Sequence, residues 1–237
     1  MNAIEVTLIG FAPGLYWLWI FLRRRTFSPD AHRAAVQVFA LGALSAVGVL
    51  RFRPNLELHF SGSLGFASEL MDAFVVTALS EEAFKLIACV LGAFFFRRLK
   101  DPKEGLIYGA GAGLGFASCE NVVYLIQTAE PSVVFYRAFT ATLAHVGFTS
   151  SLAYAVALAR FRTHFRVTMI AGAFLSAVVL HGTYNWLLWQ GTPLNWLAIL
   201  VILPLTLTAL SLKWQSPKSE QSVMDVPISA SPRTSHP

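Results

Sequence analysis

The sequence predicts an all-α polytopic membrane protein with about seven transmembrane helices, and three observations support that class. The 237 residues are 55% hydrophobic and only 13% charged, which is too apolar for an ordinary soluble domain. Apolar stretches near the length of about 20 residues that a membrane-spanning helix needs recur along the chain. The basic residues gather between alternate stretches, as topology signals do. We therefore treat residues 1–212 as a single membrane domain.

Seven spans follow from this pattern, and the second of them is short. The first is not a cleavable signal, because no basic residue precedes it and Arg23, Arg24 and Arg25 follow it instead. The tail 213–237 is rich in Ser and Pro and should be disordered. The predicted spans are residues 4–22, 34–50, 72–96, 106–127, 133–158, 167–189 and 194–212.

The distribution of basic residues sets an orientation in the cell membrane. If Arg23, Arg24 and Arg25 face the cytoplasm, the N-terminus is outside, and seven spans place the C-terminus in the cytoplasm. Most other Lys and Arg residues then also fall inside, and the outer loops carry only Arg51, Arg53 and Arg137. The net charge of +5 then reflects contact with anionic lipid rather than nucleic acid. The bilayer is the expected partner.

Polar residues inside the predicted spans are the main functional signal. A charged residue at the bilayer centre costs about 2.5–3.5 kcal/mol on the insertion scale, so such residues must be paired, neutralised or reached by water. Those that concern us are Glu81, Glu82 and Lys85 on the third span, Glu120 on the fourth, His145 on the fifth, and His181 with Asn185 on the sixth.

These residues lie at similar predicted depths in the membrane and therefore form one layer. Counted from the outer ends of the helices at 1.5 Å per residue, the carboxylates and imidazoles lie roughly 12–18 Å below the outer surface. Scattered polar residues would not share a depth, so we predict one wet cavity built by spans three to six, the four-helix catalytic core. The shorter path for water runs from the outer side. For Asn121, beside Glu120, we prefer a structural role between helices.

Local spacing assigns provisional roles. Glu81 and Lys85 are four residues apart with Glu first, which suits a helical ion pair. That pairing leaves Glu82 without a partner, so we predict Glu82 as the base that activates water and Glu81 as its neighbour in the site. His181 and Asn185 share a helix face. Histidines or the amide of Asn185 can stabilise the oxyanion formed on a scissile carbonyl.

The glycines between residues 105 and 115 serve packing. Gly105, Gly109 and Gly113 form one small-xxx-small row, and Gly111 with Gly115 forms another, so this span should approach its neighbours closely. A nucleotide-binding loop is excluded because the G-x-G-x-x-G register fails and no strand precedes it.

These motifs resemble the PrsW-type intramembrane proteases. "EEAFK" matches the Glu-Glu-x-x-Lys signature, "FASCE" is similar to the Phe-x-x-x-Glu motif at Phe116 and Glu120, and His145 and "HGTYN" resemble the third and fourth motifs. The type II CAAX-processing proteases are more distantly similar and carry histidine where this chain has Glu120. The first cytoplasmic loop, "SPDAHR", departs from the acidic stretch usual in the family.

The resemblance implies peptide-bond hydrolysis in or near the membrane, with a single-span substrate such as an anti-sigma factor. The shorter path for water from the outer side adds the expectation that the cut falls in or near the outer half of the substrate's span. It implies Glu81, Glu82, Glu120, His145 and His181 as site residues. The PrsW-type family is classed with metalloproteases, which implies a divalent metal, zinc in our expectation, held by Glu120, His145 and His181. The CAAX relatives are treated as glutamate proteases, and that mechanism needs no cofactor.

Two other classes remain open from the residues alone. Buried Glu and His chains also form proton relays in transporters, but the sequence has no repeat of the kind that transporters often carry. A non-catalytic membrane scaffold is the second alternative. It would not need a polar residue at every position of the site, yet every such position is filled here.

Overall fold

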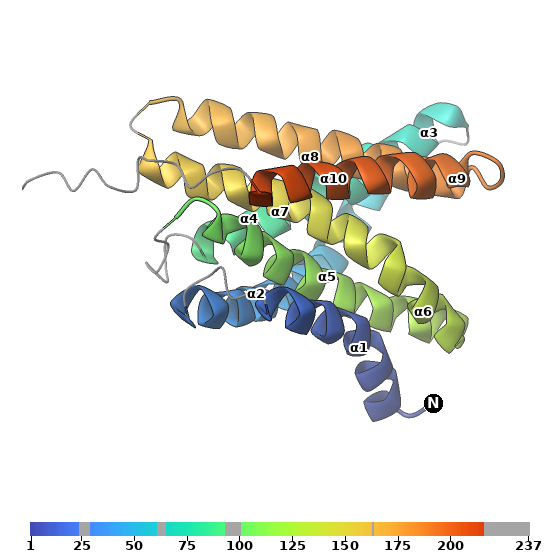
Figure 1. The fold of residues 1–237 in the computed structure, drawn as a ribbon. Helices are drawn as coiled ribbons and strands as arrows, with labels where there is room; N and C mark the ends of the chain where they lie inside the picture. Colours follow the sequence, from blue (N-terminus) through green and yellow to red (C-terminus); the bar gives the residue numbers. More distant parts are fainter. Residues whose placement is uncertain (24–28, 61–64, 93–100, 163, 216–237) are drawn as a thin grey trace, which may run out of the picture.

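The chain folds into a bundle of helices (Figure 1), described by a computed structural model for residues 1–23, 29–60, 65–92, 101–162 and 164–215. No strand occurs among these residues, which confirms the all-α class. The N-terminus, α6 and α9 lie at the same end of the bundle in Figure 1, which we call the α6 end. The elements are α1 (Ala3–Leu22), α2 (Pro29–Phe60), α3 (Phe66–Leu70), the π-helix η1 (Met71–Leu79), α4 (Ser80–Val90), α5 (Glu104–Thr128), α6 (Pro131–Phe139), α7 (Ala141–Phe161), α8 (Arg166–Trp189), α9 (Asn195–Leu197), the π-helix η3 (Ala198–Ile202) and α10 (Leu203–Gln215).

Five helical stretches are long and apolar enough to cross a membrane, and they comprise α1, α2, α6 with α7, α8, and α9 through α10. The two other predicted spans, residues 72–96 and 106–127, correspond to η1 with α4 and to α5. Both carry acidic site residues, and α5 is almost entirely buried along its first fifteen residues, Glu104–Ser118. A helix surrounded by protein needs less apolar surface than one that faces lipid. The number of seven spans therefore stays a prediction.

The second span is longer than predicted. We expected residues 34–50 from their apolar composition, whereas α2 runs from Pro29 to Phe60. Its last part is polar and continues as helix, with Arg53 Nε 2.8 Å from Glu57 Oε1 across one turn. At 1.5 Å per residue the full helix is about 48 Å long, so it exceeds the hydrocarbon core.

The third span is not a uniform α-helix. Its first part, η1, is wound as a π-helix up to Leu79, and α4 then begins at Ser80, directly before Glu81 and Glu82. π-Helical turns are rare and are frequently found at functional sites. The prediction for this span extended to residue 96, and its end falls outside the described residues, as do several of the predicted cytoplasmic basic residues and most of the tail.

Helix α5 is the centre of the bundle and packs against α2, α7 and α1. Its two rows of glycines face different helices, and the absence of side chains lets the backbone of α5 lie close to each of them. A Cβ at Gly115 would clash with the carbonyl oxygen of Phe39 in α2, and a Cβ at Gly113 would lie 2.7 Å from the carbonyl oxygen of His145 in α7. Buried apolar residues of α2, α5 and α7 form a shared core that includes Ala31, Ala34, Ala35, Val38, Ile107, Tyr108, Ala112, Ala153, Val156 and Ala157.

The fifth predicted span, residues 133–158, is broken in two. α6 ends at Phe139 and α7 begins at Ala141, with Thr140 in a non-helical conformation between them. The short α6 is held against α1, because Trp17 Nε1 donates a 2.8 Å hydrogen bond to the carbonyl oxygen of Ala138. Thr140 therefore divides this predicted span into two helical segments.

Candidate active site

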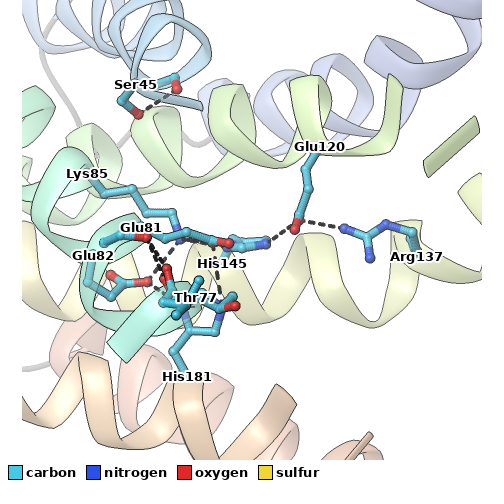
Figure 2. A network of polar contacts seen from close by, with 12 residues as sticks. Ser45, Thr77, Glu81, Glu82, Lys85, Glu120, Arg137, His145 and His181 are labelled. Carbon is cyan, nitrogen blue, oxygen red and sulfur yellow. Dashed lines mark hydrogen bonds and ion pairs between the residues drawn. The ribbon is translucent and has the colours of Figure 1, made fainter. Parts of the chain in front are cut away.

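The predicted polar residues converge in the interior of the bundle (Figure 2). Glu81, Glu82 and Lys85 come from α4, Glu120 from α5, His145 from α7 and His181 from α8. Glu82 and Lys85 are fully buried, and Glu81 is only 2% exposed. The structure therefore brings these residues together through direct contacts among them.

Lys85 is the positive centre of this cluster. Its Nζ lies 2.9 Å from Glu82 Oε1 and 3.3 Å from Glu81 Oε2, so it pairs with both glutamates. The predicted pair with Glu81 is therefore confirmed, whereas the expectation that this pair would leave Glu82 without a partner is wrong. The helix spacing of three as well as four residues brings both carboxylates within reach of one ammonium group. Nζ also lies 4.1 Å from the centre of the Phe116 ring.

His181 is oriented by a carboxylate on one side and faces the site on the other. Its Nδ1 lies 2.8 Å from Glu82 Oε1, and since a carboxylate only accepts, Nδ1 carries the proton. The other nitrogen, Nε2, then keeps a lone pair and lies 3.7 Å from Glu81 Oε2. Phe148 stacks on the ring at a centroid distance of 5.5 Å. Glu82 therefore fixes the tautomer and the direction of His181.

His145 is oriented in the same way from the opposite side. Its Nε2 lies 2.9 Å from Glu120 Oε2 and so donates to that carboxylate. Its Nδ1 then accepts from Lys85 Nζ at 2.9 Å. The two imidazole rings lie 5.3 Å apart, nearly perpendicular. Each histidine therefore gives one N–H to a glutamate and turns its other nitrogen toward the same centre.

Glu120 has a partner that the sequence analysis missed. Arg137 of α6 donates from its terminal nitrogen to Glu120 Oε2 at 2.6 Å and from Nε to Asn121 Oδ1 at 2.7 Å. We had placed Arg137 among the outer loop residues, whereas it is buried, with 9% exposed. The signal was available, because Arg137 is the one basic residue in the apolar stretch "PSVVFYRAF".

Asn121 has the structural role that we predicted. Besides accepting from Arg137, it donates from Nδ2 to Thr142 Oγ1 in α7 at 3.3 Å. It therefore connects α5 to both segments on either side of the break at Thr140.

The cluster fits a divalent metal, with one ligand different from the predicted set. Among the described residues, ligand atoms of Glu81, His145 and His181 lie within 4.8 Å of one another. Two histidines with one glutamate are a known catalytic zinc set, and ligating histidines typically donate their other N–H to a carboxylate or carbonyl. Glu82 and Glu120 supply those carboxylates. We had expected Glu120 as the third ligand, but depth does not fix direction around a helix, and Glu120 is engaged with Arg137 and His145.

Two cavities meet at the site. One of about 360 Å³ is lined by Glu120, His145, His181 and Asn185 and extends to Trp189 and Asn195 at the α6 end. This is where the structure places Asn185, whose half-buried side chain shares the cavity with the two histidines. The other, of about 340 Å³, lies between α2 and α5 and reaches Glu81 and Glu120. Glu120 therefore lines both cavities, and at least one other residue of the cluster lines each of them.

These features define a class: a multi-pass helical membrane protein with a buried carboxylate–histidine centre of the kind that hydrolases use. Residues 30–210 match the family described as PrsW family intramembrane metalloprotease. The chain is 28% identical over 186 residues to Protease PrsW of Oceanobacillus iheyensis, covering 78% of this chain and 83% of the relative. It is 27% identical over 204 residues to Protease PrsW of Clostridioides difficile (84% of each chain) and 25% identical over 181 residues to that of Bacillus subtilis (76% and 80%).

The chain belongs to the PrsW family of intramembrane metalloproteases. It is accordingly a membrane-embedded protease. No solved structure matches it.

Proposed function

We propose that this protease cuts a single-span membrane protein within or just beyond the outer half of its span, as in the release of an anti-sigma-factor-like regulator. The observation that carries the proposal is the cavity that runs from His145 and His181 past Asn185 toward Trp189 at the α6 end. Hydrolysis inside a membrane needs a path for water to buried polar groups, and this cavity offers one.

The proposed position of the cut depends on the orientation of the chain in the membrane. From the positive-inside pattern we infer that the α6 end faces outside and that the C-terminus is in the cytoplasm. A substrate helix that unwinds near the cavity would then present its outer half to the site. The external part of the substrate would be released.

Glu81 is the carboxylate that we assign to the attacking water. Lys85 and His181 both approach its Oε2, and its side chain lines the cavity between α2 and α5. Oε1 of Glu81 would take the proton of the water as the oxygen bonds to the scissile carbonyl carbon. The same proton then passes to the amide nitrogen as the carbon–nitrogen bond breaks, which leaves a carboxylic acid and an amine.

Glu82 acts through His181 in this scheme. Its Oε1 is occupied by Lys85 Nζ and His181 Nδ1, and the whole residue is buried. We therefore assign the role of the base to Glu81 rather than to Glu82, which the sequence alone favoured. The Asn185 amide, on the next turn of the helix from His181, would donate to the oxyanion that forms on the carbonyl.

A divalent ion would be held by Glu81, Nδ1 of His145 and Nε2 of His181. When bound, it supplies Lewis-acid polarisation of the scissile carbonyl or of the attacking water. Glu82 and Glu120 keep the two imidazoles in the tautomers that leave these nitrogens unprotonated, and Lys85 balances the charge of the glutamates.

The proposal is tested by co-expressing the protein with a set of tagged single-span membrane proteins. The wild type should release the external tag from at least one of them, and Glu81→Gln, at equal protein level, should leave that substrate uncut. Release of the tag by Glu81→Gln at the wild-type rate would overturn the assignment. Release of a cytoplasmic tag instead would overturn the orientation.

A further inference from the structure

We propose that Arg137 is a positioning residue of this active site, which holds Glu120 so that Nδ1 of His145 faces Glu81 and His181. This inference rests on the proposed function of the site. Arg137 belongs to none of the sequence motifs considered above, and it reaches the site from α6, on the other side of the break at Thr140 from His145.

The guanidinium group of Arg137 is fixed by three different contacts. Its terminal nitrogen lies 2.6 Å from Glu120 Oε2, and its Nε lies 2.7 Å from Asn121 Oδ1. The plane of the group lies over the Tyr124 ring, with Cζ 3.9 Å from the ring centre. The planar fork of an arginine matches such an arrangement, whereas the single ammonium group of a lysine would satisfy only part of it.

Glu120 connects the fixed guanidinium group of Arg137 to the imidazole of His145. One oxygen, Glu120 Oε2, receives both the Arg137 bond and the 2.9 Å bond from His145 Nε2. A carboxylate only accepts, so its position favours the imidazole tautomer that carries the proton on Nε2. Without Arg137, the Glu120 carboxylate would lose its fixed orientation. The preference for the His145 tautomer with the proton on Nε2 would then be weaker.

The contact with Asn121 stabilises the same part of the fold. Asn121 also binds Thr142 in the first turn of α7, one turn before His145. Arg137 lies on α6, on the other side of the break at Thr140. The network Arg137–Asn121–Thr142 thus bridges the break and anchors the helix that presents His145.

The experiment compares Arg137→Met and Arg137→Lys with the wild type, and uses Arg51→Met as the matched control. Arg51 is an exposed arginine on α2 and has no role in the network. Arg137→Met should lower kcat by about 10–100-fold, the range typical of residues that orient a catalytic group, with KM changed less than about twofold. Arg137→Lys should recover part of the loss, and guanidinium ions at millimolar concentration should partly restore Arg137→Met but not Glu120→Gln.

A double-mutant cycle separates positioning from general destabilisation. If Arg137 acts through Glu120, adding Arg137→Met to Glu120→Gln should lower kcat by less than about twofold further, because contacting residues are not additive. Full additivity of the two changes would overturn the proposal. A rise in KM with unchanged kcat would also overturn it, since Arg137 would then bind substrate.

A readout that does not depend on catalysis keeps the inference distinct from the proposed function. In protein labelled with ¹⁵N-histidine, the His145 signals are those missing in His145→Gln. They should report a proton on Nε2 in the wild type and in Arg51→Met, and a mixture of tautomers in Arg137→Met. If no sample cleaves a substrate but Arg137→Met still shows the mixture of His145 tautomers, the proposed function is wrong and the role of Arg137 stands. If the His145 signals in Arg137→Met are the same as in the wild type, the role of Arg137 is refuted.

Discussion

Lys85 Nζ lies 2.9 Å from His145 Nδ1, although the two residues are sixty positions apart in the chain. A buried ammonium group therefore occupies the centre toward which Glu81, Glu82 and one nitrogen of His145 are directed. The same groups would surround a divalent ion, so the positive charge of Lys85 and a bound ion compete for the same negative environment.

Replacing Lys85 by Met should therefore increase the affinity for zinc. Met has a similar length but no charge, and two like charges about 4 Å apart repel by about 4 kcal/mol at a protein-like dielectric. We expect the zinc affinity to rise at least about tenfold, measured by competition with a chromophoric chelator. Equal zinc affinity in Lys85→Met and wild type would show that an ion does not bind beside Lys85.

The two neighbouring glutamates should differ in importance. Glu81→Gln removes the proposed base and should lower cleavage by at least about 100-fold. Glu82→Gln keeps an oxygen that can accept from His181, so its loss should be about tenfold, as expected for an orienting residue. Both rates are measured with purified protein at matched amounts. A larger loss in Glu82→Gln than in Glu81→Gln would return the role of base to Glu82.

Removal of metal should stop the reaction. Because the family consists of metalloproteases and Glu81, His145 and His181 offer a compact ligand set, purified active protein should hold about one divalent ion per chain. A strong chelator should abolish cleavage, and added zinc should restore it. Undiminished cleavage by metal-free protein would assign the enzyme to the glutamate type.

The close approach of α5 and α7 can be tested at one glycine. A Cβ at Gly113 would lie 2.7 Å from the His145 carbonyl oxygen, whereas nothing lies within 4 Å of a Cβ at Gly172. Gly113→Ala should thus destabilise the fold by about 1–3 kcal/mol and lower activity by displacing His145. Gly172→Ala, the matched control in α8, should keep or raise the melting temperature, because alanine favours helix. Equal melting temperatures for the two variants would contradict this packing.

Access to the site should come from outside the cell. With Cys89 and Cys119 replaced by Ala, Leu188→Cys in the cavity lining should react with a membrane-impermeant thiol reagent added to intact cells. Arg166→Cys, at the opposite end of the same helix, should react only in inside-out vesicles. The reverse pattern would invert the orientation inferred from the basic residues.

Sequence analysis could predict the composition of the site better than its internal geometry. Helical spacing and depth sufficed to bring Glu81, Glu120, His145 and His181 into one layer, because both follow from the fixed rise of a helix. The direction of each side chain around its helix depends on packing between helices. That is why the sequence missed the partner of Glu82, and why depth alone could not choose between Glu81 and Glu120 as the third ligand of a metal.

Arg137 illustrates a different limit. Positive residues near span ends are usually topology signals, so we interpreted Arg137 as an outer loop residue, although its apolar surroundings could have indicated a buried ion pair. The break at Thr140, which separates α6 from α7, has no Pro or Gly to mark it. The polar extension of α2 beyond residue 50 was likewise invisible to a search for apolar stretches.

The most direct test of the central claim is hydrolysis of a single-span peptide by purified protein in liposomes made with ¹⁸O-labelled water. We predict that mass spectrometry finds a new carboxyl terminus carrying ¹⁸O, located in the outer half of the span or just beyond it, and that Glu81→Gln forms none of it. An equal yield of the labelled product from Glu81→Gln would contradict the account, as would a cut that maps only to the cytoplasmic half of the span.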